Sequence, residues 1–208
     1  MKKHVEYLRS LNACPSAVGY ADKFDTLEEA WNACERGDWM LWLVGKLTGG
    51  EVGSDSRKKL VGVSCKCARL ALPYVSEGET RPLMAIETCE AYTRGEATID
   101  QVVSAARAAN DAASDAYAAA RAAADASYAA TVAVLAYGAA VFAAAAYAAA
   151  YGADAAAAYA AAYASDAAAY ATDAAAYGPV YANRLKTLRT CSKIIRAEYS
   201  FAELGVSL

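Results

Sequence analysis

The chain has 208 residues, and 57% of them are hydrophobic, with alanine making up a large share of that fraction. Its 20 lysines and arginines nearly balance 23 aspartates and glutamates, which gives a net charge of −3. This balance argues against a nucleic-acid-binding protein, since such proteins normally carry a basic surface.

The N-terminal sequence and the cysteine content indicate the compartment. Lys2, Lys3 and His4 make the start of the chain basic, but Glu6 and Arg9 interrupt any apolar segment of a signal peptide. Six cysteines occur beside a single histidine, His4, which lies near a chain end that we expect to be mobile. We therefore expect a cytoplasmic protein whose thiols are reduced and mostly buried.

The composition changes near Asp100 and divides the chain into three parts. Residues 1–97 have an ordinary composition with frequent turn signals, residues 98–178 are rich in alanine and tyrosine, and residues 179–208 are basic and amphipathic. Alanine is the strongest helix former, so the second part should be helical even where packing is weak. We predict an all-α fold, a multi-helix bundle with long alanine-rich helices, in which the three parts form one continuous domain.

Two helices are predicted before residue 50. Thr26 and Glu29 have the spacing of a capping box, in which Thr26 caps a helix and Glu29 reaches back to it. This helix should end at Gly37, because glycine after a periodic run is the usual C-terminal signal. Asp38 then serves as the N-cap of an apolar helix over residues 39–47.

A third helix is predicted after a glycine-rich loop at residues 49–53. Ser54 or Ser56 can cap this helix, which should continue to about Leu72. Pro73 should end it, because the residue before a proline is disfavoured in helical geometry.

Proline and glycine delimit the next helix. Pro82 suits its first turn, and the helix should run to Arg94 and Gly95. Thr98 and Gln101 form a second capping box, with which the alanine-rich part begins.

A seven-residue repeat of tyrosine and aspartate dominates the end of the alanine-rich part. Tyr163, Tyr170 and Tyr177 alternate with Asp166 and Asp173. Spacings of three and four place these residues on one helical face, where each phenol can donate to a carboxylate. The repeat therefore predicts a polar aromatic seam along a helix.

A long uncharged stretch raises the question of membrane insertion. Residues 126–153 contain no charged side chain and would be long enough to cross a bilayer. Most of them are alanine, which contributes little to insertion, and aspartates rather than lysines flank the stretch. We favour a central helix of a soluble bundle, with turns or kinks at Gly138 and Gly152.

No catalytic or metal-binding constellation is evident. Cys65 and Cys67 are two positions apart, so on a helix their sulfurs would point about 200° apart and would not share one ion. Neither a zinc-type ligand spacing nor a phosphate-binding loop occurs, and one histidine near a chain end is a poor catalytic base. We expect no enzyme activity, no metal and no cofactor.

Aromatic and basic residues are the candidates for binding. Trp31, Trp39 and Trp42 are predicted to lie in the core of the N-terminal bundle, with one exposed tryptophan as an interface anchor as the alternative. Residues 180–201 combine an apolar stripe through Leu188 and Ile195 with basic residues. This segment is expected to dock on the bundle with its charges facing water, or else to meet an acidic partner, RNA or a membrane surface.

Four motifs resemble a known family. They are AWxACxxGDW at residues 30–39, CARLALP at 67–73, RPxxAIE at 81–87 and YxRGE at 92–96. Together they are similar to the Imm-5-like immunity proteins, alanine-rich bacterial proteins with relatives in phage genomes. The resemblance covers roughly residues 10–110 through motifs and the rest through composition. It implies a protein that binds and neutralises a toxin, and it carries no catalytic residues.

Three functional hypotheses follow. The first is a non-enzymatic immunity or inhibitor protein that occludes a partner protein, such as a toxin or a defence protein. The second is a structural protein that self-assembles into homo-oligomers through the Tyr/Asp repeat. The third is a phage-type sponge for a nucleotide signal, with arginines holding the phosphates. Nucleic acid and membrane partners are not expected. The candidate binding residues are Trp31, Asp38, Trp39, Arg69, Arg81, Arg94, Tyr163, Tyr170 and Tyr177.

Overall fold

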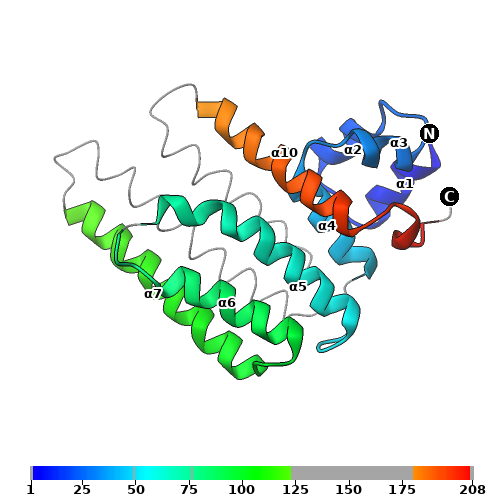
Figure 1. Ribbon diagram of the computed structural model, residues 1–208. Coiled ribbons are helices and arrows are strands. Elements are labelled where there is room, and N and C mark those ends of the chain that lie inside the picture. Colours follow the sequence, from blue (N-terminus) through cyan, green and yellow to red (C-terminus); the bar gives the residue numbers. More distant parts are fainter. Residues whose placement is uncertain (1, 49, 76, 123–179, 207–208) are drawn as a thin grey trace.

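The protein is an all-α, multi-helix structure in the part of the chain that is described (Figure 1). This computed structural model describes residues 2–48, 50–75, 77–122 and 180–206. The helices are α1 (Lys3–Ser10), α2 (Pro15–Ala21), α3 (Leu27–Ala33), α4 (Gly37–Thr48), α5 (Asp55–Ala68), α6 (Arg81–Arg94), α7 (Ile99–Ala122) and α10 (Val180–Glu198), with short 3-10 helices η1 (Arg69–Tyr74) and η2 (Ala202–Leu204). The predicted fold class is confirmed.

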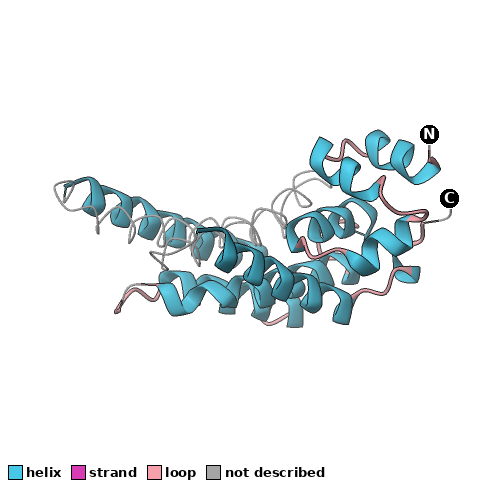
Figure 2. Cartoon of the chain, turned by 90° about the horizontal axis from the view of Figure 1, so that it is seen from above, coloured by secondary structure: helices cyan, strands magenta, loops and turns pink. Residues whose placement is uncertain are grey.

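The helices form two groups that are joined through α10. The short helices α1, α2 and α3 gather beside α4 at the end of the molecule where both termini lie (Figure 1). Helices α5, α6 and α7 lie side by side, because α5 packs on α6 and α6 packs on α7. Helix α10 packs on both α4 and α5, so it lies between the two groups (Figure 1). Seen from above, the described segments are helices joined by loops (Figure 2).

One apolar core runs through α1, α3, α4, α5 and α10. Its fully buried members include Val5, Leu41, Leu60, Cys67 and Ile195, each no more than 1% exposed. His4 also lies inside this part of the molecule, and its Nε2 is 3.1 Å from the carbonyl oxygen of Ala21. The expectation that His4 lies at a mobile end was wrong, because the first helix packs into the core.

Several predicted helix boundaries are confirmed in atomic detail. The Thr98 backbone N–H donates to Gln101 Oε1 at 2.7 Å, and the Gln101 N–H donates to Thr98 Oγ1 at 3.3 Å. Ser54 caps α5 by accepting from the Arg57 N–H at 3.3 Å. Helix α6 has Pro82 in its first turn and ends at Arg94, and the following Gly95 caps it in the left-handed conformation with φ 78°. These features are local, which is why sequence spacing predicts them.

The connection between α3 and α4 differs from the prediction. Helix α3 ends at Ala33 rather than Gly37, and α4 begins at Gly37, so Asp38 lies in the first turn instead of at the N-cap. The reason is tertiary: a Cβ atom on Gly37 would lie 2.4 Å from the Cβ of Cys191. Glycine is needed here so that α4 and α10 can approach closely, and not to terminate a helix.

The end of α5 also differs from the prediction. The α-helix stops at Ala68, and residues Arg69–Tyr74 continue as a 3-10 helix that contains Pro73. A proline ring at position 73 would clash with the carbonyl of residue 69 in an α-helix and has no N–H to donate to it. The change from α-helix to 3-10 helix therefore comes at residue 69, four residues before Pro73, and the chain does not leave the helical conformation at residue 72.

Helix α10 carries the predicted apolar stripe where its side chains are described. Leu188, Cys191 and Ile195 are buried, while Lys186 and Lys193 face water as expected. Arg196 is the exception, because its guanidinium turns inward toward α3. No helix among the described residues is long and apolar enough to cross a membrane. The stretch 126–153, with Gly138 and Gly152, lies outside the described residues.

Candidate functional site

An apolar pocket lies among the four N-terminal helices. Its walls are apolar side chains such as Leu27, Trp31 and Trp42, which are buried, while Tyr20 and Trp39 are only partly buried and form its mouth. The free volume is about 50 Å³. On the same scale a cavity that holds one water molecule measures about 10–15 Å³, so the pocket has room for the tip of an apolar side chain.

The mouth of the pocket is built from packed aromatic rings. Tyr20 and Trp39 have their ring centroids 5.6 Å apart with the planes tilted by 53°, and Tyr20 lies 5.1 Å from Phe24 in a similar arrangement. Such tilted pairs are the favoured geometry for aromatic side chains. The three rings therefore hold one another in place on the surface.

A charged pair covers one side of Trp39. The Arg36 guanidinium carbon lies 4.3 Å from the centroid of the Trp39 ring, which is a cation–π contact. Arg36 Nε also donates to Asp38 Oδ1 at 2.8 Å. Asp38 is 7% exposed, so this pair is partly shielded from water. The side chains of Arg36, Asp38 and Trp39 consequently form one fixed unit beside the mouth.

Helix α10 contacts the backbone of residues that line the pocket. Arg196 Nη1 donates to the carbonyl oxygen of Cys34 at 2.6 Å and to that of Trp31 at 3.3 Å, and it lies 3.5 Å from Met40 Sδ. Cys34, Trp31 and Met40 all line the pocket. On the surface, Arg189 Nε donates to a carboxylate oxygen of Glu35 at 2.7 Å. The shape of the pocket thus depends on the position of the C-terminal helix.

The ionisable groups of the pocket remain neutral at neutral pH. Burial, followed by the charges of Cys34 and Glu35, raises the pKa of Tyr20 to about 12. Burial also raises the pKa of the Cys34 thiol to about 11. The pocket therefore presents a neutral phenol and a neutral thiol to whatever enters it.

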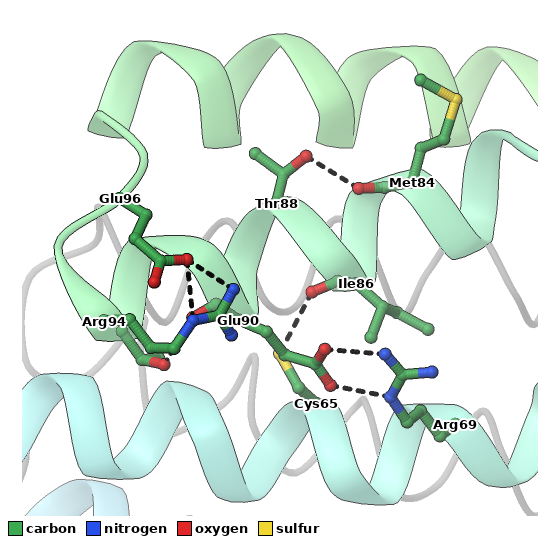
Figure 3. Close-up of polar contacts among 9 residues, drawn as sticks. Cys65, Arg69, Met84, Ile86, Thr88, Glu90, Arg94 and Glu96 are labelled. Carbon is green, nitrogen blue, oxygen red and sulfur yellow. Dashed lines mark hydrogen bonds and ion pairs between the residues drawn. The ribbon is translucent and has the colours of Figure 1, made fainter.

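The three candidate arginines are engaged with glutamates of the same chain. Arg69 donates to both carboxylate oxygens of Glu90 at 2.7 Å, and Arg94 Nε donates to Glu96 at 2.7 Å (Figure 3). Arg81 Nε donates to a carboxylate oxygen of Glu79 at 2.9 Å. Arg81 and Arg94 lie at opposite ends of α6, about 20 Å apart at 1.5 Å per residue. The structure does not gather the three arginines around one phosphate.

The remaining predicted site residues divide into three groups. Trp39 lies at the mouth of the pocket, whereas Trp31 is buried in its wall and Asp38 is buried beside Arg36. Tyr163, Tyr170 and Tyr177 lie outside the described residues. The sequence analysis did not single out Tyr20, Arg36 or the inward-facing Arg196. The four-residue spacing of Tyr20 and Phe24 is the one local signal that could have found an aromatic cluster.

Comparison with known proteins identifies no relative: no family model, no curated protein and no solved structure matches the chain. Within the ranges that the structure describes, no group of three or more His, Cys, Asp or Glu side chains is placed to hold a metal ion.

Proposed function

We propose that the protein is a non-enzymatic binding protein of the immunity or inhibitor type, which occludes a surface of a protein partner. The partner would place an apolar side chain in the pocket behind Tyr20 and Trp39. The motif resemblance to the Imm-5-like proteins supports the type of partner, a toxin or a defence protein. The proposal places the protein in the cytoplasm, where buried thiols stay reduced.

The size of the pocket is the observation that carries the proposal. Pockets for small molecules and cofactors usually measure about 300–1,000 Å³. The pocket at Trp39 has about 50 Å³ of free space. It suits one leucine or methionine tip that belongs to a larger surface, and this is how a protein partner engages an apolar pocket.

The residues around the mouth are those that dominate protein interfaces. Tryptophan, tyrosine and arginine are enriched among the side chains that contribute most binding energy. Trp39, Tyr20 and Arg36 stand together here and are held by stacking and by the Arg36–Asp38 pair. A surface that is already rigid loses little conformational entropy when a partner binds, so the partner binds it more tightly than it would bind a flexible surface.

The two other hypotheses have less support. The nucleotide sponge requires free arginines around a phosphate, whereas Arg69, Arg81 and Arg94 are each paired with a glutamate of the same chain. Self-assembly would use the Tyr/Asp repeat at residues 163–177, which lies outside the described residues. It remains a prediction that sedimentation across a wide concentration range would test.

Partner capture with matched variants tests the proposal. Tagged wild-type protein, Trp39→Ala and Met84→Ala would each be used as bait in lysate of the cells that make the protein. Met84 is 57% exposed on α6, away from the pocket, so it controls for the loss of an exposed apolar side chain. Wild type and Met84→Ala should capture one stoichiometric protein that Trp39→Ala does not. A protein captured equally by all three baits, or no stoichiometric protein at all, would contradict the proposal.

A further inference from the structure

The described part of α10 exposes a row of basic side chains. Lys186, Arg189 and Lys193 face water at spacings of three and four residues, which places them in one line along the helix. We call these three residues the α10 basic row. Helix α10 contains no aspartate or glutamate before Glu198. A helix face that is merely solvated usually alternates positive and negative charges, so the single sign of this row favours contact with a negatively charged partner.

The α10 basic row lies next to the mouth of the apolar pocket. Arg189 Nε donates to a carboxylate oxygen of Glu35 at 2.7 Å. Glu35 follows Cys34, which lines the pocket, and precedes Arg36, whose guanidinium carbon lies 4.3 Å from the centroid of the Trp39 ring. Helix α10 also packs along α4, the helix that carries Trp39 (Figure 1). Residues 34–36 therefore join the basic row and the aromatic mouth into one continuous surface.

The two lysines at the ends of the row give it a net positive charge. Arg189, between them, is paired with Glu35. Within the described residues, neither Lys186 nor Lys193 is in an ion pair. The acidic first turn of α3 lies at the opposite end of that helix from the α10 contact. Both ammonium groups can therefore meet carboxylates of a partner without breaking a described contact within the chain.

We propose that the α10 basic row is the charged part of the partner interface and that the partner is an acidic protein. This inference deepens the proposed function and rests on it, because the pocket at Trp39 is the apolar part of the same interface. The partner places an apolar side chain in the pocket and aspartate or glutamate carboxylates beside Lys186 and Lys193. Opposite charges attract before contact, so the row also raises the rate of association.

The dimensions of this surface fit one protein interface. Lys186 and Lys193 are seven residues apart, which is about 10 Å along the helix at 1.5 Å per residue. A standard interface buries about 800 Å² on each partner, which for a round patch is about 30 Å across. The row and the mouth, joined through the Glu35 and Arg36 contacts, fit within such a patch. The net charge of −3 and the apolar pocket favour a protein over an RNA as the acidic partner.

Partner capture with charge-reversal variants tests the proposal. The full-length baits would be wild type, Lys193→Glu, Arg107→Glu and Trp39→Ala, and circular dichroism would confirm that each is folded. Arg107 is exposed on α7, which packs on α6, so Arg107→Glu makes the same change in net charge away from the row. The probe is the protein that wild type captures from lysate of the cells that make the chain. The amount retained over a series of bait concentrations gives its apparent Kd.

The expected pattern depends on salt. At about 0.1 M salt, Lys193→Glu should raise the apparent Kd at least about fivefold, because it places a like charge opposite the partner's carboxylates. Arg107→Glu should leave the apparent Kd unchanged. At about 1 M salt the Debye length falls from about 10 Å to about 3 Å, so Lys193→Glu should differ little from wild type. Mass spectrometry should identify the captured protein as acidic.

The remaining outcomes separate this inference from the proposed function. Capture that Trp39→Ala abolishes, but that Lys193→Glu and salt leave unchanged, would overturn the acidic partner and leave the pocket as the binding site. Equal weakening by Lys193→Glu and Arg107→Glu would also overturn it, because only overall charge would then matter. Loss of the captured material after nuclease treatment would identify RNA and overturn it as well. Capture by Trp39→Ala equal to that by wild type would contradict the proposed function, and this inference with it.

Discussion

Arg196 donates a hydrogen bond to the carbonyl oxygen of Cys34 at 2.6 Å, across 162 positions of sequence. Cys34 is the residue that follows α3, and Arg196 also reaches the carbonyl of Trp31 in the last turn of that helix. The final carbonyls of a helix lack partners within the helix and favour a positive charge. The C-terminal helix thus supplies the C-terminal cap of an N-terminal helix, and this contact defines the wall of the pocket.

Removing the guanidinium should destabilise the fold. Arg196→Ala leaves the carbonyl of Cys34 without this donor, while the carbonyl of Trp31 still accepts from the Cys34 N–H at 3.2 Å. We expect a loss of about 1–3 kcal/mol in the free energy of unfolding. Urea denaturation monitored by circular dichroism would measure it. Lys193→Ala removes a positive charge from the exposed face of the same helix and should change the stability little. Equal stability of the two variants would show that the Arg196 contacts do not support the fold.

Gly37 should tolerate no side chain. In Gly37→Ala the new methyl group would meet the Cβ of Cys191 and the backbone of Leu188, so we expect overpacking to cost about 1–3 kcal/mol. Gly19, in the middle of α2, has nothing within 4 Å of its would-be Cβ. Gly19→Ala should therefore stabilise the protein by roughly 0.5–1 kcal/mol, because alanine is the better helix former.

The two glycine variants would be compared by their thermal unfolding midpoints. A lower midpoint for Gly37→Ala and an unchanged or higher midpoint for Gly19→Ala is the expected pattern. A Gly37→Ala protein as stable as wild type would mean that α4 and α10 do not approach as closely as described.

Stability should fall at alkaline pH through Tyr199. Burial raises the pKa of this phenol from 10 to about 12 in the folded protein. Because the folded state holds the proton more tightly than the unfolded state, this contribution is complete below pH 10 and is lost as the pH rises toward 12. Tyr199→Phe has no proton to lose, so the difference in unfolding free energy between pH 9 and pH 11 should be smaller for this variant. An identical alkaline loss in both proteins would exclude this role for Tyr199.

The sequence predicted the features of the fold that depend on neighbouring residues. The Thr98–Gln101 capping box and the end of α6 at Arg94 and Gly95 follow from spacings of a few positions, and both were found as predicted. The role of Gly37 was predicted wrongly because glycine serves both as a helix terminator and as a point of close approach. Which of these two roles Gly37 has depends on the packing of Cys191 against it, and Cys191 is far away in the sequence.

The candidate site was predictable only in part for the same reason. Trp39 was identified by residue type, and it does lie at the mouth of the pocket. Tyr20 and Arg36 were missed because their contacts with Trp39 arise from the packing of α2 against α4 and from the irregular α3–α4 connection. Arg69 was chosen for its charge, but that charge is engaged by Glu90 from another helix.

The affinity of the partner for pocket variants tests the central claim most directly. Once the partner has been captured, isothermal titration calorimetry would compare wild type, Trp39→Ala and Met84→Ala. A residue that anchors an interface contributes about 2 kcal/mol or more, which corresponds to a Kd roughly 30-fold higher after truncation. We expect this weakening for Trp39→Ala and an unchanged Kd for Met84→Ala. Equal affinities for wild type and Trp39→Ala would contradict binding through the pocket.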